Sequence, residues 1–304
     1  ILARQHARTF EKRFKSLPVN IEQLSRIGGT KAVRETLDKL KNGTLDIVVG
    51  THRLLSKDVE FANLGLLVVD EEHRFGVNHK ERIKKMRTAL DVLTLSATPI
   101  PRTLQMALYG FRDMSVIQTP PVDRLPVITQ VVAFDESNIR NAIERERKRG
   151  GQIFFVHNRI QTIDAMASYI NDIVPDLNIG IVHGRKTEAS NSQVMRAFLD
   201  GDIDLLLATT IIESGPDFPI ANTMLINRAD YFGLAQLYQL RGRVGRSSRQ
   251  AYAQLMIPGE DLISEKARKR LGALRVFAEL GSGYRIALRD LEIRGAGNLL
   301  GTKQ

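Results

Sequence analysis

The stretch LLVVDEEHRFGV, residues 66–77, joins four apolar residues directly to three carboxylates and a histidine. An apolar run with two adjacent valines is typical of a strand that is buried on both faces of a parallel sheet. In open α/β sheets ligands bind just beyond the carboxyl ends of the strands, where Asp70, Glu71 and His73 would lie. Many buried strands also end in polar loops without a function, so this pattern alone leaves both interpretations open.

Apolar runs of strand length alternate with helical patterns along most of the chain. We predict strands at residues 46–49, 65–69, 91–95, 152–156, 178–182, 204–208 and 223–226. We predict helices at residues 1–16, 31–42, 78–88, 159–172, 188–199 and 233–241. This alternation predicts an α/β fold with parallel sheets and helices on both of their faces.

Two changes of pattern divide the chain. TPPVDRLP at 119–126 has three prolines and neither a helical nor a strand period, which favours a linker between two α/β units. After residue 257 the sequence predicts a helical hairpin, with Ser264 as the N-cap of its first helix, and then a glycine-rich loop. The predicted parts are therefore 1–118, 119–126, 127–257 and 258–304.

Composition excludes several classes of protein. The chain has 304 residues, of which 43% are hydrophobic and 26% charged, as in ordinary soluble proteins. No apolar stretch is long enough to span a membrane, so we expect no membrane contact. The chain contains no cysteine, which rules out disulfides and thiolate metal sites and favours the cytoplasm. The six histidines show no spacing typical of a metal site.

Positive charge is unevenly distributed. The net charge is +10, and Lys and Arg outnumber Asp and Glu by 20 to 13 over residues 1–118 and by 9 to 6 over residues 258–304. Residues 119–257 carry 15 of each kind. Excess positive charge on particular segments suggests a polyanionic partner, because neutralised phosphates release counterions. Nucleic acid is the expected partner, although a merely basic soluble protein would show the same charge.

Short polar motifs follow several of the predicted strands. GTH at 50–52 and SAT at 96–98 follow strands of the first unit, and ESGPDFP at 213–219 and QLRGRVGRSSR at 239–249 lie in the second. Each motif alone could be a strand end, a turn or a basic loop. Their joint order is more informative than any one of them.

Read together, DEEH, SAT, ESGPD and QLRGRVGR resemble motifs II, III, V and VI of the superfamily 2 helicases and translocases, in the same order. Three longer stretches are similar to the motor of the bacterial transcription-repair coupling factor family. They are GLLVVDEEHRFGVNHKERIK, RADYFGLAQLYQLRGRVGRSSRQAYA and LRDLEIRGAGNLLG. The RecG branch-migration helicases, the nearest relative, share HRFGV and TPIPRT. The resemblance implies two RecA-like parallel-sheet lobes, the first truncated at its N-terminus, followed by a helical hairpin and loop.

The resemblance also implies roles at a nucleotide site. ATP and Mg²⁺ would be the cofactors, with Asp70 holding the metal, Glu71 orienting the attacking water and His73 linking the site to the SAT motif. Arginine fingers would reach the γ-phosphate from the QLRGRVGR motif. These fingers would be Arg243 and Arg246. The residues that bind ATP and couple the lobes would be Gln239, Gly215, Asp217, Ser96 and Thr98.

A second set of residues is predicted to contact DNA phosphates from the loops at strand ends, which positions a duplex without reading its sequence. This set contains Arg26, Thr51, His52, Arg53, Arg102, His157, Asn158, Arg159, Arg185, Thr209 and Thr210. The hairpin resembles the element named for translocation in RecG, and its loop would act through Arg289, Arg294 and Gln304. A cap on the second lobe is the alternative for this element.

The chain departs from the family pattern in two places. It has no G-x-x-x-x-G-K-[ST] phosphate loop, and RIGGTKAV at 26–33 is only a poor imitation, so we expect that loop upstream and expect the 304 residues alone to be inactive. Pro216 stands where motif V usually has an aliphatic residue, which removes a backbone N–H and restricts Gly215.

The function implied by the resemblance is that of an ATP-dependent translocase on double-stranded DNA. The family displaces stalled RNA polymerase and recruits excision-repair proteins, through regions that this sequence does not contain. A RecG-like branch-migration helicase is one alternative. A basic scaffold that binds nucleic acid without hydrolysis is another, and a phosphate loop upstream would argue against it.

Overall fold

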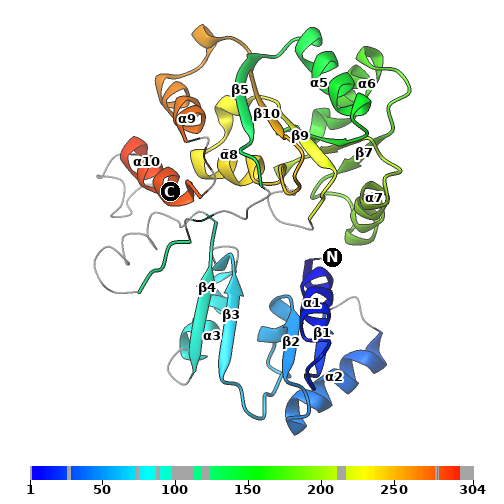
Figure 1. Cartoon of the computed structure of the whole chain (residues 1–304), viewed down its shortest axis with the longest axis vertical. Helices are drawn as coiled ribbons and strands as arrows, with labels where there is room; N and C mark the ends of the chain where they lie inside the picture. The colour runs from blue at the N-terminus through cyan, green and yellow to red at the C-terminus, as the bar shows by residue number, and fades with distance from the viewer. Residues whose placement is uncertain are drawn as a thin grey trace. The chain divides into compact units, whose positions relative to one another are not determined.

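The structure is a computed structural model of the chain. It describes residues 2–25, 29–72, 75–86, 90–97, 113–117, 119, 124–210, 217–277, 279 and 281–294, apart from the side chain of residue 294. The chain forms two compact units, Ile1–Ala97 and Thr98–Gln304, here called unit 1 and unit 2 (Figure 1). The four-part division made from the sequence stays a prediction.

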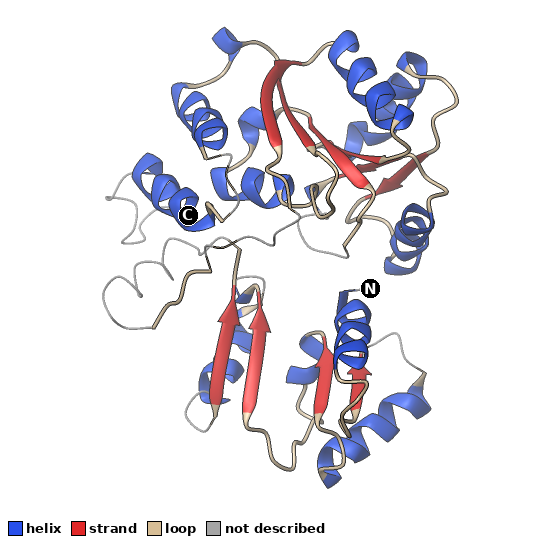
Figure 2. Ribbon diagram, viewed as in Figure 1, coloured by secondary structure: helices blue, strands red, loops and turns tan. Residues whose placement is uncertain are grey.

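Unit 1 contains two pairs of parallel strands. Strand β1 pairs with β2, and β3 pairs with β4 in the register Val68 to Leu93. The bounds are α1 Leu2–Arg13, β1 Ile21–Leu24, α2 Thr30–Asn42, β2 Ile47–Gly50, the 3-10 helix η1 His52–Leu55, β3 Leu66–Asp70, α3 Val77–Met86 and β4 Asp91–Leu95. Each pair runs in the direction that brings its carboxyl ends to one edge (Figure 2).

Among the described residues, only one face of the β3–β4 pair is covered. Val69 packs with Ile83 of α3 in a small core. Leu66 and Val68, which alternate with Val69, are about half exposed. The prediction that this strand is buried on both faces is therefore wrong for the part of the chain that the structure describes. The reason is that its apolar run contains side chains of both faces, and the run itself says nothing about what covers each face.

Unit 2 is built on one six-stranded sheet. Its strands follow the order β5-β10-β9-β6-β8-β7, and every neighbouring pair is parallel. The bounds are β5 Ile128–Ala133, α5 Glu136–Lys148, β6 Gln152–Val156, η3 Ile160–Thr162, α6 Ile163–Ile173, β7 Ile179–Val182, α7 Glu188–Asp200, β8 Leu205–Ala208, β9 Ala221–Ile226, η5 Ala229–Tyr231, α8 Leu234–Arg241, β10 Tyr252–Ile257, η6 Glu260–Leu262, α9 Glu265–Val276 and α10 Gly283–Arg294. The predicted α/β fold with parallel sheets is confirmed.

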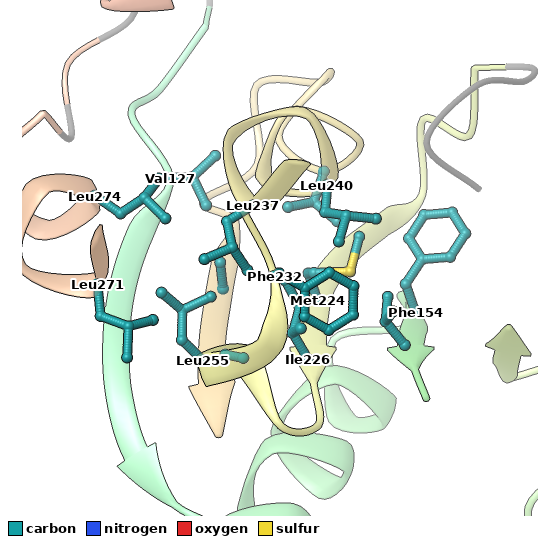
Figure 3. Close-up of a cluster of buried hydrophobic side chains, with 14 of the residues drawn as sticks. Val127, Phe154, Met224, Ile226, Phe232, Leu237, Leu240, Leu255, Leu271 and Leu274 are labelled. Atoms are coloured by element: carbon teal, nitrogen blue, oxygen red, sulfur yellow. The ribbon is translucent and has the colours of Figure 1, made fainter. Parts of the chain in front are cut away.

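Hydrophobic cores cover both faces of this sheet. Phe154 and Phe155 are adjacent in β6, both fully buried, and belong to different cores. Helices α5 and α6 supply residues to one core, and α7, α8, α9 and α10 supply residues to the other. Figure 3 shows Leu271 and Leu274 of α9 in the same cluster as Leu237 of α8. The helical hairpin therefore shares its core with the sheet.

Local sequence explains several element ends. Ser264 is the N-cap of α9, as predicted, and its hydroxyl accepts a hydrogen bond from the Ala267 amide at 3.2 Å. Asp135 caps α5 in the same way, with the Asn138 amide at 2.8 Å. Helix α5 and strands β1, β5 and β10 were not predicted. Asp135 followed by apolar residues at helical spacing, from Ile139 to Ile143, is the signal that could have found α5.

No helix in the described part of the chain has both the length and the apolar character needed to cross a membrane.

We predict that Phe198→Ala destabilises unit 2 by about 3–5 kcal/mol, because the substitution leaves a cavity among packed rings. Phe198 is fully buried, and its ring centroid lies 5.2 Å from those of both Phe154 and Phe218. Urea unfolding of the purified chain measures the loss. Leu262→Ala is the control, since Leu262 is 73% exposed and its truncation should change the free energy of unfolding by less than about 0.5 kcal/mol. Equal effects of the two substitutions would contradict the prediction.

Candidate functional site

Glu71 lies at the carboxyl end of β3 and is held by the loop that follows β4. Its carboxylate accepts a hydrogen bond from the Ser96 hydroxyl at 3.0 Å and another from the Ala97 amide at 3.3 Å. Its own amide donates to the Leu95 carbonyl at 2.9 Å. The φ of Glu71 is +50°, a left-handed conformation that is uncommon for residues other than glycine and occurs often at functional sites. Parallel pairing of β3 and β4 thus joins the DEEH and SAT motifs directly.

Asp70 is exposed at the end of the same strand. Its position opposite Leu95 places it on the uncovered face of the β3–β4 pair. The described residues include no cluster of three or more metal-binding side chains. Mg²⁺ commonly takes one or two protein carboxylates and completes its shell with phosphate oxygens and water, so a single exposed carboxylate fits a metal that arrives with a nucleotide. His73 and Thr98 lie outside the described residues.

The arginine-rich motif of unit 2 forms the turn after α8. Arg246 donates from Nε to the Gly242 carbonyl at 3.2 Å, and its terminal nitrogen lies 3.4 Å from Asp217. Arg243 and Gln239 lie close to Arg246 in the sequence, and both are half-buried. Gln239 belongs to α8. The structure therefore brings Asp217 and Arg246 together. Gly215 and Pro216 lie outside the described residues.

Arg124, in the predicted linker, was not singled out from the sequence. Its Nε donates to the Gly245 carbonyl at 2.9 Å, in the middle of the arginine turn. Burial lowers the pKa of the Arg124 guanidinium, and the neighbouring Arg246 charge lowers it further. Gly245 has a φ of +73°, and a Cβ there would lie 3.0 Å from Val127. The shape of this turn thus depends on contacts with residues more than a hundred positions earlier in the chain.

The nucleic-acid residues predicted in unit 2 lie at one edge of the sheet. His157 follows β6, Arg185 follows β7 and Thr209 follows β8, and these three strands are neighbours in the sheet. Asn158, Arg159 and Arg185 are exposed, whereas Thr209 and Thr210 are half-buried. His157 is only 7% exposed. Parallel pairing therefore gathers this set along one line of loops, with His157 beneath the surface.

Residues of unit 1 that were predicted to contact DNA make contacts with other groups of unit 1. Arg53 makes a two-point ion pair with Asp58, at 2.7 and 2.5 Å, and its side chain is 16% exposed. The Thr51 side chain accepts from the Arg53 amide at 3.4 Å. The His52 ring lies 5.5 Å from that of His79. Arg53 thus has a structural partner that its sequence context did not reveal. Arg26 and Arg102 lie outside the described residues.

His157 belongs to a hydrogen-bonded series that spans two loops. The Asn227 amide nitrogen lies 3.0 Å from its Nδ1, and the Thr162 hydroxyl lies 2.8 Å from its Nε2. An amide nitrogen can only donate, so Nδ1 accepts and Nε2 carries the proton that is donated to Thr162. Burial lowers the pKa of His157, and the charge of Arg159 lowers it further. Both effects favour the neutral form of the histidine.

The helical hairpin is joined to α8 and to the loop after β9 by hydrogen bonds from arginine side chains to backbone carbonyls. Arg241, at the end of α8, donates to the Leu274 carbonyl at 3.1 Å. Arg270 of α9 donates to the Asp230 carbonyl at 2.8 Å. Arg289 is exposed and pairs with Glu292 at 2.6 Å. The side chain of Arg294 and the whole of Gln304 lie outside the described residues.

Comparison with known families adds independent support. The DEAD/DEAH box helicase family model matches residues 1–107, and the helicase conserved C-terminal domain model matches residues 136–248. Each model matches about a third of the chain, in the order first and second helicase domain. Together with the parallel sheets and the order of the motifs, these matches make the chain similar to the superfamily 2 helicases and translocases.

Within this class the chain is similar over its whole length to transcription-repair-coupling factors. That of Bacillus subtilis strain 168 is 55% identical over 304 residues, which are all of this chain and 26% of that protein. That of Staphylococcus haemolyticus strain JCSC1435 is 54% identical over the same coverage. A structure of RecG bound to a three-way DNA junction matches 98% of this chain and 39% of that one, with a TM-score of 0.78 and 37% identity. The resemblance stated from the motifs is confirmed, and the chain spans about a quarter of its curated relatives.

The lowered pKa of His157 predicts a pH dependence of stability. Its ordinary pKa is 6.5, so between that value and the lowered one the unfolded chain binds a proton that the folded chain does not. The free energy of unfolding of unit 2 should therefore fall as the pH drops below about 6.5.

His157→Gln should reduce this loss, as measured by urea unfolding at pH 7.5 and pH 5.5. The matched control is His183→Gln, which changes a histidine directly after β7, two strands away from β6 in the same sheet. If the His157 variant kept the full pH dependence, the buried neutral histidine would not be its cause.

Proposed function

We propose that this chain is motor sequence of an ATP-dependent translocase on double-stranded DNA, of the transcription-repair-coupling type. The observation that carries the proposal is the contact of Glu71 with Ser96 and Ala97, because it joins a carboxylate at a strand end to the polar loop of the neighbouring strand. In phosphoryl transfer the protein acts by positioning groups and stabilising charge. A carboxylate held by two hydrogen bonds is suited to such positioning.

Within unit 1, the two carboxylates would have different tasks. Asp70 is exposed and presents a hard oxygen ligand, so it is the proposed ligand of Mg²⁺. When bound, Mg²⁺–ATP supplies the γ-phosphoryl group and a metal charge that offsets phosphate charge. Glu71 would orient the attacking water, and Ser96 would keep the Glu71 carboxylate in place. A movement of the loop after β4 would lengthen or shorten the hydrogen bond from Ser96 and would so shift the Glu71 carboxylate.

Within unit 2, Arg243 and Arg246 are the proposed arginines for the charge that develops on the γ-phosphate. Arg246 is held by the Gly242 carbonyl and by Asp217. The carbonyl holds the guanidinium without cancelling its charge, whereas Asp217 partly offsets it. Movement of Asp217 would therefore change the charge that Arg246 presents. Gln239, Gly215 and Asp217 are proposed to couple nucleotide state to this turn.

The proposed partners follow from charge and from the relatives. Double-stranded DNA fits the positive excess and the loops after β6, β7 and β8. RNA polymerase and excision-repair proteins are further proposed partners of a complete protein of this type. They would bind regions that lie outside the quarter of the relatives' length that this chain matches. A RecG-like branch-migration activity is a second candidate, favoured by the match to RecG on a three-way DNA junction.

The first test of this function uses Glu71→Gln. This chain would replace the corresponding segment of the Bacillus subtilis relative, which is 55% identical to it. The chimera should hydrolyse ATP in the presence of DNA, and Glu71→Gln should reduce turnover by at least about 100-fold while ATP binding persists, because only the water-orienting group is lost. Steady-state ATPase and equilibrium nucleotide-binding assays measure both.

The control for this test is Glu81→Gln, which removes an exposed carboxylate of α3 in the same unit and should leave turnover unchanged. Near-normal turnover of the Glu71 variant would exclude Glu71 as the catalytic carboxylate. A chimera that binds DNA but never hydrolyses ATP would instead favour the non-hydrolysing scaffold.

The second test concerns the arginine turn. In related reactions arginine fingers contribute roughly 10³ to 10⁵ in rate. Arg246→Ala in the same chimera should therefore lower kcat by about 10³, with a much smaller change in KM for ATP. Arg196→Ala, at an exposed position of α7, is the control. Equal losses in rate and in nucleotide affinity would indicate that Arg246 only binds the nucleotide.

A further inference from the structure

The direction of the Arg246 side chain depends on the peptide that joins it to Gly245. A peptide unit is planar, so the direction of the Gly245 carbonyl also fixes the plane from which the chain continues into Arg246. Gly245 has a φ of +73°, a left-handed conformation that favours glycine. A contact that holds the Gly245 carbonyl therefore acts on the place at which the Arg246 side chain starts.

Arg124 makes such a contact. Its Nε donates to the Gly245 carbonyl at 2.9 Å, although the two residues are 121 positions apart. The Arg124 side chain is half-buried, so water competes less for this bond than it would at the surface. Hydrogen bonds from a charged donor are also stronger than those between neutral groups. The Gly245 carbonyl is therefore held firmly by a residue that lies outside the arginine-rich motif.

The residues that follow Arg124 anchor it to the sheet. The Gln250 side chain donates to the Pro126 carbonyl at 2.7 Å. Val127 is 5% exposed and belongs to the core of unit 2, in the same cluster as leucines of α8 and α9 (Figure 3). Strand β5 begins at Ile128 and pairs with β10. The arginine turn thus gains an anchor in the sheet through the segment that leads into β5.

We propose that Arg124 is a positioning residue for Arg246 and acts through the peptide that joins Gly245 to Arg246. This inference rests on the proposed function, in which Arg246 meets the charge that develops on the γ-phosphate. It goes beyond that function, because Arg124 belongs to none of the motifs that predicted the site. The sequence predicts Arg124 to be part of a linker, and in this role the linker also affects the rate of hydrolysis.

The rate of hydrolysis should depend strongly on this support. A misplacement of about 1 Å can lower the rate of a catalysed reaction by about 100-fold. Loss of the Arg124 bond would leave the Arg246 guanidinium in place, with its contacts to the Gly242 carbonyl and Asp217. We therefore expect the loss of rate to be smaller than the loss caused by Arg246→Ala.

The test uses Arg124→Met in the chimera with the Bacillus subtilis relative. Methionine keeps an unbranched side chain but has no group that can donate to the Gly245 carbonyl. We expect kcat for ATP hydrolysis to fall by about 10- to 100-fold. The KM for ATP should change by less than about threefold, because the contact is needed for the transition state and not for nucleotide binding.

Arg140→Met is the matched control. Arg140 of α5 also donates from Nε to a backbone carbonyl, that of Ile173, at 3.2 Å. Helix α5 supplies residues to the core on the opposite face of the sheet from α8. The same substitution here should leave kcat unchanged. Equal losses of kcat in the two variants would overturn the inference.

A double-mutant cycle with Arg246→Ala separates positioning from general damage to the fold. If Arg124 acts through Arg246, Arg124→Met should lower kcat by less than about threefold once Arg246 is alanine. A full additional loss in that background would overturn the inference. So would a normal kcat of the single Arg124→Met variant, while the proposed function would stand if Arg246→Ala remained slow. A normal kcat of Arg246→Ala would instead refute the proposed function, and this inference with it.

Amide hydrogen exchange provides a readout that does not depend on ATP hydrolysis. The peptide that covers residues 243–248 should exchange about tenfold faster in Arg124→Met, the change expected for the loss of one charge-assisted hydrogen bond. Arg140→Met should not change it. Peptides from β6 and β8 should exchange as in the unmodified chimera, which shows that the core is intact. Unchanged exchange of residues 243–248, or faster exchange throughout unit 2, would overturn the assignment of Arg124 to the turn.

Discussion

Parallel pairing of strands is the constraint on which the rest of this molecule depends. When all strands of a sheet run in one direction, each loop that follows a strand emerges at the same edge. In unit 1 this brings Glu71 into hydrogen-bonding distance of Ser96, although the two are separated by 25 residues. In unit 2 it brings His157 against Asn227, although they are 70 residues apart. Both candidate sites follow from this one geometric rule.

A second recurring feature is the arginine side chain that donates a hydrogen bond to a backbone carbonyl. Arg124, Arg241, Arg246 and Arg270 each donate to a backbone carbonyl oxygen of another segment or turn of unit 2. A carbonyl fixes the direction of a guanidinium without neutralising it, so the positive charge is kept while the loop is held. Arg228 and Arg53 show the other solution, a two-point pair with a carboxylate. Arg228 still lines a cavity, whereas the Arg53 side chain is only 16% exposed.

The sequence predicted most of the fold because the pattern of apolar residues carries that information. The strands of unit 2 whose apolar runs are continuous, such as β6 and β8, were predicted nearly to the residue. Strands β5 and β10 were missed, since polar residues such as Gln130 and Gln254 interrupt their apolar runs. The face of β3 that stays uncovered among the described residues was predicted wrongly, because an apolar run does not reveal what packs on each side.

Residue types and their order, taken by themselves, determined which class of protein this chain resembles. The chemistry of DEEH, SAT and QLRGRVGR is local, and a short stretch carries all of it. Tertiary structure alone decided which of the predicted residues are free to act. Arg53 is paired with Asp58 and His157 is buried, whereas Thr162, Arg124 and Arg228 gain their positions from strands and loops far away in the chain. The physical reason is that hydrogen bonds and ion pairs depend on distances that arise only when strands pair and side chains pack, and no local pattern encodes them.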